Sequence, residues 1–266
     1  MAHRGDHPLL CLNPDGRLLP EVGPAVQRKS NTCDLHGTVP IPMETRHWLH
    51  GLHDDPWDNV WVTDVGRHLV MKFDPAGILI ATFGHDGEHG CSDRLFYQPT
   101  HVCILPTGGF FVADGYGNSR IIKFSATGRR RLEWGTRGPA PGEFHTPHVI
   151  TLGRDGLLYV SDRGNDRGQV FDSDGSLRAE WSGLHSVDDL HAAPDGRIYG
   201  AAGLDNAIVE FDSQGRPAQV WAKPGFFCYP HCLTLDAAGT IYVAEIAGNR
   251  GLRLRRSLPA RPMSLS

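Results

Sequence analysis

Short, mainly apolar runs separated by polar, glycine-containing turns recur along the chain with a period of about 40–50 residues. Each copy contains a run rich in β-branched and aromatic residues, and most of these runs end on an acidic residue: 60–64, 110–114, 158–162, 198–202 and 241–245. A second run and a glycine turn follow in most copies, and no helical period of useful length is present. Four short strands per unit at this period are typical of a β-propeller blade.

The repeat can be followed through five copies, which begin near residues 49, 98, 146, 186 and 229. Residues 1–24 add two further apolar runs joined by Pro14-Asp15-Gly16, and the last copy has three strands without a clear fourth. We therefore expect a single all-β domain over residues 1–266, a propeller of six blades whose first blade is incomplete at the N-terminus. Residues 25–47 do not fit the repeat and are expected to form a surface loop.

The amino-acid composition agrees with this fold and argues against nucleic acid and membranes as binding partners. The 266 residues include 32 glycines and 19 prolines, as a chain dense in turns requires. A formal net charge of −4 provides no basic field for nucleic acid, and no apolar run is long enough to span a membrane. Six scattered cysteines and no visible signal peptide favour a reduced, cytoplasmic location, and we expect a monomer. The chain begins abruptly at Met1, which leaves room for an upstream segment.

Three histidines occupy the same place in alternate copies of the repeat. His50, His148 and His231 each open the first strand of a copy, about eight residues before its turn. Innermost strands line the channel of a propeller, so these side chains are expected to converge there. Three neutral imidazoles bind zinc at about 2.0–2.1 Å and leave one position open for substrate. His101 is out of this register by one residue and should face away. The alternative is that all three are ordinary buried or surface histidines.

Several motifs give the chain a specific resemblance. It resembles NHL-repeat propellers and, over nearly its whole length, the peptidyl-α-hydroxyglycine α-amidating lyases. The motifs that carry the resemblance are His3-Arg4-Gly5-Asp6-His7, Leu49-His50-Gly51-Leu52, Gln98-Pro99-Thr100, Asp114-Gly115-Tyr116-Gly117-Asn118-Ser119-Arg120, Pro147-His148 and Ser161-Asp162-Arg163. The resemblance implies a six-bladed propeller with a three-histidine zinc ion in its channel. It also implies cleavage of an N-acyl-α-hydroxyglycine, a small-molecule or peptidyl substrate, to a primary amide and glyoxylate.

The same resemblance assigns roles to individual residues. It implies that His50, His148 and His231 bind zinc, that Tyr116 is the catalytic tyrosine, and that Arg4 and Arg163 are the active-site arginines. A phenol ordinarily titrates near 10, and neighbouring positive charge lowers that value, which suits a tyrosine to act as base. Arginine stays protonated and matches a carboxylate. Without the resemblance, Tyr116 could be a loop aromatic, Arg163 could pair with Asp162 or Asp166, and Arg4 could be solvated.

The chain departs from the family pattern near the third histidine. Tyr229 stands where the family has a pocket-lining methionine, and Cys232 stands where it has an aspartate that helps hold calcium. A thiol is a poor ligand for a hard cation, so we expect zinc but no calcium. Two cysteine pairs of secreted members are replaced by Tyr97 with Gly117 and Tyr159 with Val170, as expected of a cytosolic relative. No monooxygenase domain accompanies the repeats.

Two other functions remain open on the sequence alone. Many NHL propellers bind proteins or RNA and catalyse nothing, so the chain could be a protein-interaction module. Such a module would not require channel histidines in register, nor Tyr116 and Arg163. A zinc hydrolase could also use the same three histidines and an activated water. The lyase is the interpretation that accounts for all of these residues together.

Overall fold

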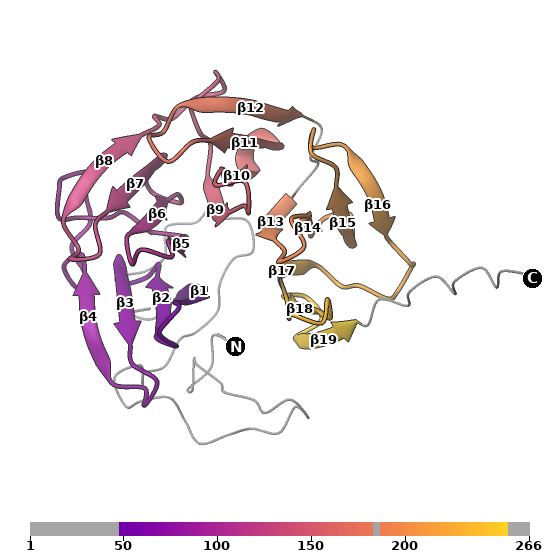
Figure 1. The fold of residues 1–266 in the computed structure, drawn as a ribbon, viewed down its shortest axis with the longest axis horizontal. Coiled ribbons are helices and arrows are strands. Elements are labelled where there is room, and N and C mark those ends of the chain that lie inside the picture. The colour runs from indigo at the N-terminus through magenta and orange to yellow at the C-terminus, as the bar shows by residue number, and fades with distance from the viewer. Residues whose placement is uncertain (1–47, 183–186, 255–266) are drawn as a thin grey trace, which may run out of the picture.

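The computed structural model describes residues 48–182 and 187–254. These residues form five antiparallel sheets arranged around a common centre, with a short first strand of each sheet innermost (Figure 1). The innermost strands are β1 (Leu49–Asp54), β5 (His101–Ile104), β9 (Pro147–Leu152), β13 (Val187–Ala192) and β17 (Pro230–Leu235). The predicted all-β propeller is therefore confirmed.

The remaining strands follow in chain order from the centre outward. The second strands coincide with the acid-terminated runs of the sequence, and they are β2 (Val60–Asp64), β6 (Phe110–Asp114), β10 (Leu158–Asp162), β14 (Ile198–Ala202) and β18 (Ile241–Glu245). The third strands are β3 (Leu69–Phe73), β7 (Arg120–Phe124), β11 (Arg167–Phe171), β15 (Ala207–Phe211) and β19 (Arg250–Leu254). The outermost are β4 (Leu79–Phe83), β8 (Arg130–Trp134), β12 (Leu177–Ser182) and β16 (Pro217–Trp221), and η2 (Arg163–Asn165) is a single 3-10 turn.

The prediction of six blades is wrong: the described residues make five. Four sheets have four strands and the fifth, β17-β18-β19, has three, as its sequence indicated. The count of six treated residues 1–24 as a partial blade, and those residues lie outside the described part of the chain. Two apolar runs also provide only half of the strands that a complete blade contains, so a blade count based on them overreached.

Hydrophobic side chains fill the spaces between consecutive blades. One cluster joins Trp61 and Val70 of the first blade to Phe110 and Phe124 of the second, and similar clusters join each later pair. The second strands β6, β10 and β14 are buried at every position, whereas the outermost strands β4, β8 and β16 have only exposed and partly buried residues. Each blade therefore completes its neighbour's core, and the stacking fixes where the inner strands lie.

The acidic residues that end the second strands bind the segment leading into the inner strand. Asp64 accepts a hydrogen bond from the Trp48 amide at 3.0 Å, and Asp162 accepts one from the His145 amide at 2.7 Å. Desolvated carboxylates of this kind hold the entry to the inner strand at a constant position. Within the described residues, no helix is long and apolar enough to cross a membrane.

Candidate metal centre and active site

A β-bulge occurs at the same point in four inner strands. The antiparallel register shifts between Leu49 and Leu52 in β1, at the start of β9, between Val187 and Asp189 in β13, and between Pro230 and Cys232 in β17. The residues left in these bulges are His50 with Gly51, His148, Asp188 and His231. A bulge redirects a side chain that strand alternation would place elsewhere. The four side chains at these positions therefore share one backbone irregularity.

The three predicted metal ligands lie together. One potential ligand atom from each of His50, His148 and His231 lies within 4.8 Å of the other two. Their ring centroids are 4.6 Å apart for His50 and His148, 5.0 Å for His148 and His231, and 5.3 Å for His50 and His231, with the rings nearly perpendicular to one another. Such edge-on packing brings ring nitrogens, rather than ring faces, toward a common point.

Backbone carbonyls set the tautomer of two of these histidines. The Nδ1–H of His50 donates to the Thr100 carbonyl at 2.7 Å, and the Nδ1–H of His148 donates to the Asp188 carbonyl at 2.6 Å. A carbonyl only accepts, so both Nε2 atoms keep their lone pairs. Burial, and then the Arg163 charge and the other two histidines, hold the pKa of His148 well below its usual value. Neutral imidazoles with converging lone pairs are the donor set that zinc requires.

Tyr116 lies against the histidine cluster. Its hydroxyl is 3.0 Å from Nε2 of His50 and 3.0 Å from Nε2 of His148. The ring of Trp48 stacks on the Tyr116 ring with centroids 5.6 Å apart and planes 22° from parallel. The phenol oxygen is therefore held beside the Nε2 atoms of His50 and His148. This placement distinguishes Tyr116 from a loop aromatic that only packs against its neighbours.

Arg163 reaches the same point from the third blade. Its Nη1 lies 3.3 Å from Nε2 of His148, and its guanidinium carbon is 5.3 Å from the centroid of the Tyr116 ring. Its ion-pair partner is Asp188, with Nη1 3.2 Å from Oδ1, rather than Asp162 or Asp166. Burial alone would lower the pKa of Arg163, but Tyr116 and Asp188 outweigh it and the pKa is raised. The cation is thus secured next to the phenol.

Asp188 connects two of these groups. Its carbonyl accepts from His148 and its carboxylate accepts from Arg163, and the residue is fully buried. Burial raises the pKa of Asp188 to about 6, against the opposing effect of Arg163. Asp188 occupies the place in the fourth repeat that the histidines occupy in theirs, but the sequence did not identify it as the partner of Arg163, and it gave Trp48 no role. The only signal for Trp48 was its place just before Leu49-His50.

Other predicted residues fall as follows. Arg4 lies outside the described residues. His101 is not one of the three clustered histidines, and its Nδ1 lies 3.1 Å from the Ile150 carbonyl. The ring of Tyr229 lies parallel to that of His231, with centroids 6.5 Å apart, so it borders the cluster. A Cβ on Gly117 would collide with the ring of Tyr97. That pair is therefore in contact, although neither member is a cysteine.

Comparison with known proteins agrees with the repeat. Residues 96–124 match the NHL repeat family. Peptidyl-alpha-hydroxyglycine alpha-amidating lyase 1 of Drosophila melanogaster is 36% identical over 250 residues, which cover 82% of this chain and 46% of that protein. Peptidyl-glycine alpha-amidating monooxygenase A of Xenopus laevis is 42% identical over 75% of this chain and 24% of its own length. The chain thus spans about half or less of the length of these two relatives.

Solved structures share the fold at lower identity. Selenomethionine-substituted virginiamycin B lyase from Staphylococcus aureus aligns with a TM-score of 0.59 at 17% identity, covering 77% of this chain and 66% of that one. At that identity the likeness shows a common fold alone. The sequence relatives are informative about descent, because their identity extends over most of this chain. The chain belongs to the NHL-repeat family of peptidyl-α-hydroxyglycine α-amidating lyases.

Proposed function

We propose that this chain is a zinc-dependent lyase that cleaves an N-acyl-α-hydroxyglycine to a primary amide and glyoxylate. The observation that carries the proposal is the contact of the Tyr116 hydroxyl with Nε2 of both His50 and His148, with Arg163 beside the phenol ring. Family membership supports it, because the Drosophila relative is named for this lyase activity. A proton acceptor, a metal-binding cluster and a fixed cation are the groups that this cleavage needs.

His50, His148 and His231 would hold the zinc ion. Bound there, zinc supplies Lewis acidity, which lowers the pKa of a substrate hydroxyl and stabilises negative charge on its oxygen. The neutral state of His148 and the carbonyl contacts of both Nδ1 atoms favour this assignment. Calcium is not part of the proposal, because Cys232 offers a thiol, a poor ligand for a hard cation, where the family has an aspartate.

Tyr116 is the proposed general base. In its ionised form the phenol oxygen takes the proton of the substrate hydroxyl. The electrons of that O–H bond form the aldehyde C=O, the C–N bond breaks, and its electron pair goes to the amide nitrogen. Tyr116 then returns the proton to that nitrogen, so no water is consumed and the tyrosinate is regenerated. The step therefore needs one group that both accepts and donates, within hydrogen-bond reach of the reacting oxygen.

Arg163 is proposed to keep the tyrosinate charged and to face the substrate carboxylate. The planar guanidinium carries five N–H donors on three nitrogens. One of these nitrogens, Nη1, contacts His148 and Asp188. The ion pair with Asp188 restricts the orientation of the Arg163 guanidinium. The guanidinium therefore does not lose conformational entropy at each turnover in order to act on Tyr116. Tyr229, beside His231, is proposed to narrow the site toward small hydroxyglycine derivatives rather than long peptides.

Glyoxylate release tests the proposal. The zinc-replete chain should convert N-benzoyl-α-hydroxyglycine to benzamide and glyoxylate in equal amounts, faster than the buffer alone. A zinc hydrolase would consume water and release benzoate instead, so the two products distinguish these activities. If the zinc-replete chain produces neither, the protein-interaction module is the function that remains, and the lyase proposal is wrong.

A further inference from the structure

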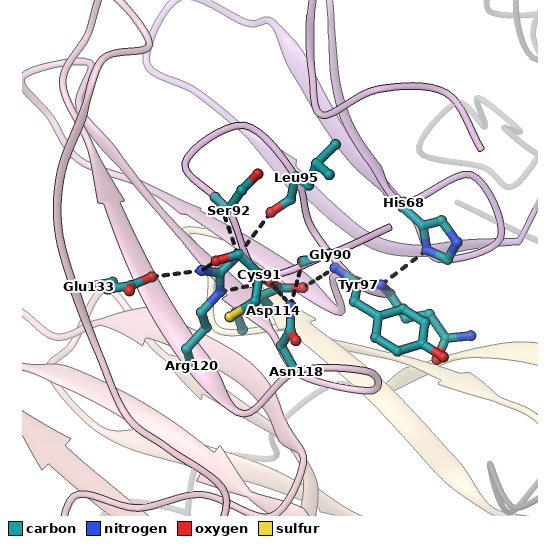
Figure 2. A network of polar contacts seen from close by, with 12 residues as sticks. His68, Gly90, Cys91, Ser92, Leu95, Tyr97, Asp114, Asn118, Arg120 and Glu133 are labelled. Carbon is teal, nitrogen blue, oxygen red and sulfur yellow. Dashed lines mark hydrogen bonds and ion pairs between the residues drawn. The ribbon is translucent and has the colours of Figure 1, made fainter. Parts of the chain in front are cut away.

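A buried carboxylate ties together the two ends of the loop that carries Tyr116. Asp114 is fully buried, and its Oδ1 accepts from the Tyr97 amide at 2.8 Å. Its Oδ2 accepts from Asn118 at 2.7 Å and from Nε of Arg120 at 3.0 Å (Figure 2). We call Asp114, Asn118 and Arg120 the Asp114 network. Along the chain, Tyr116 lies between Asp114 and the two residues, Asn118 and Arg120, whose side chains bind its carboxylate.

Arg120 extends this network to the segment before the inner strand. Its Nη1 donates to the Cys91 carbonyl at 3.0 Å and pairs with Glu133 at 2.7 Å, and its Nη2 donates to the Leu95 carbonyl at 2.8 Å (Figure 2). Only 4% of the Arg120 side chain is exposed. All three guanidinium nitrogens thus have protein acceptors, which leaves the side chain a single orientation. The Tyr116 loop is therefore attached at its base to the preceding inter-blade segment.

The loop that carries Arg163 has the same arrangement. Asp162 is fully buried, and its Oδ2 accepts from Asn165 at 2.8 Å and from Nε of Arg167 at 2.8 Å. The Arg167 guanidinium donates to three carbonyls of the preceding segment, those of Pro139, Ala140 and Glu143. We call Asp162, Asn165 and Arg167 the Asp162 network. The two proposed catalytic side chains outside the histidine cluster are thus held in equivalent ways.

The other described blades lack the complete arrangement. Ala202 stands at this place in the fourth blade. In the fifth, Glu245 binds Arg250, but the Arg250 side chain is 45% exposed and reaches the carbonyl of Phe226 alone in that segment. In the first, Leu69 stands opposite Asp64, where the second and third blades have Arg120 and Arg167 opposite their acids. Among the blades that the structure describes, the full network therefore coincides with the two loops that bear Tyr116 and Arg163.

A backbone hydrogen bond also joins each loop to the segment that leads into the inner strand of its blade. The amide of Tyr116 donates to the Gln98 carbonyl at 3.2 Å, and the amide of Arg163 donates to the Thr146 carbonyl at 3.1 Å. Both acceptors have left-handed backbones, with φ of 61° for Gln98 and 69° for Thr146, which non-glycine residues adopt only when their surroundings impose it. Thr146 is followed by Pro147 and His148. The backbone of Arg163 is thereby fixed two residues from a proposed metal ligand.

We propose that the Asp114 and Asp162 networks are positioning devices that hold Tyr116 and Arg163 against the histidine cluster. This inference rests on the proposed function. Asp114, Asn118, Arg120 and their counterparts touch neither substrate nor metal in this account. They act through the backbone, by holding the loops of Tyr116 and Arg163 to the inter-blade segments that precede the inner strands. Misplacement of a catalytic group by about 1 Å can lower turnover by about 10²-fold, so loosening either network should reduce turnover while the metal stays bound.

The test compares Arg120→Ala with Arg250→Ala. Arg250 makes the same kind of bond to the acid of its blade, but its loop carries no site residue, so it is the matched control. We expect Arg120→Ala to lower kcat for glyoxylate release by about 10–100-fold with KM within about twofold, and added guanidinium to restore part of kcat. Arg250→Ala should keep the wild-type kcat. Should Arg120→Ala misfold, Asn118→Ala removes one side chain from the network and is expected to change kcat in the same direction.

A second measurement does not depend on the activity. With tyrosines labelled with ¹³C at Cζ, the signal missing in Tyr116→Phe identifies Tyr116. Arg120→Ala or Asn118→Ala should shift or broaden that signal, and Arg250→Ala should not. If the wild type releases no glyoxylate, the proposed function fails and this signal alone decides the positioning role. An unchanged Tyr116 signal in the Arg120 and Asn118 variants, with any loss of thermal stability matched by Arg250→Ala, overturns the inference.

Discussion

The hydroxyl of Tyr116 lies 3.0 Å from Nε2 of His148. That nitrogen carries a lone pair, because the Nδ1–H of the same ring is bound to the Asp188 carbonyl. The phenol oxygen and the proposed metal ligand therefore face the same small volume, although they come from different blades. The proton acceptor and the metal-binding atoms can be removed separately, which makes their roles testable one at a time.

Replacing Tyr116 with phenylalanine keeps the ring, and with it the stacking on Trp48, but removes the proton acceptor. We expect Tyr116→Phe to lower kcat for glyoxylate release by roughly 10²–10⁴-fold, the usual contribution of a general base. Zinc content should match the wild type, because no imidazole changes. Steady-state kinetics and elemental analysis of the same preparation measure both. Equal kcat values for variant and wild type would exclude Tyr116 as the base.

Replacing His148 with alanine should empty the proposed metal site. One zinc ion per chain is expected to co-purify with the wild type, and His148→Ala should lose most of it, since two imidazoles do not make up the usual donor set. His101→Ala is the control, because His101 is one residue out of register and lies outside the cluster. Full zinc occupancy in His148→Ala, measured by elemental analysis, would show that the metal binds elsewhere.

Replacing Arg163 with glutamine removes the cation beside Tyr116 while keeping an amide that can bind Asp188. An adjacent guanidinium favours the ionised phenol, so its loss should move the acid limb of the kcat–pH profile to higher pH by about one unit or more. Arg178→Gln, on the exposed outer strand β12, is the control and should leave the profile unchanged. Superimposable profiles for Arg163→Gln and the wild type would argue against any charge coupling between Arg163 and Tyr116.

Asp189 should make the protein less stable as the pH rises. Burial raises the pKa of Asp189 to about 6 from 3.8, although the Leu233 amide and Cys232 oppose the shift. A carboxyl with a raised folded-state pKa binds more protons in the folded state, so its contribution is present at low pH and is lost as the pH passes 6. The wild type should lose about 1–1.5 kcal/mol of unfolding free energy between pH 5 and pH 7.5 from this residue.

Denaturant unfolding at both pH values checks this expectation. Asp189→Asn keeps an oxygen that can accept from Leu233 and should abolish that part of the pH dependence. Asp172→Asn is the control, because the pKa of this partly exposed turn carboxylate is lowered, chiefly by the Ser176 amide, and it stays ionised over this range. An identical pH dependence in Asp189→Asn and the wild type would mean that the Asp189 carboxyl titrates as it does in the unfolded chain.

The sequence alone determined the repeat, its strands and the equivalence of the three histidines. These are local properties: the run of residues 158–162 became β10 (Leu158–Asp162) without change, because a short apolar run rich in β-branched and aromatic residues between two turns is enough to specify a strand. The number of blades was not local. Two apolar runs near the N-terminus suggested a sixth blade, but only packing between neighbouring sheets decides which runs make one.

Only the tertiary structure decided how the site residues point and what they contact. Strand alternation predicted that His148 faces the channel, yet its direction comes from a β-bulge that has no sequence signature of its own. The pairing of Arg163 with Asp188 and the stacking of Trp48 on Tyr116 join residues of different blades. Such contacts depend on the relative placement of blades, which is set by the hydrophobic cores between them and not by the spacing of residues along the chain.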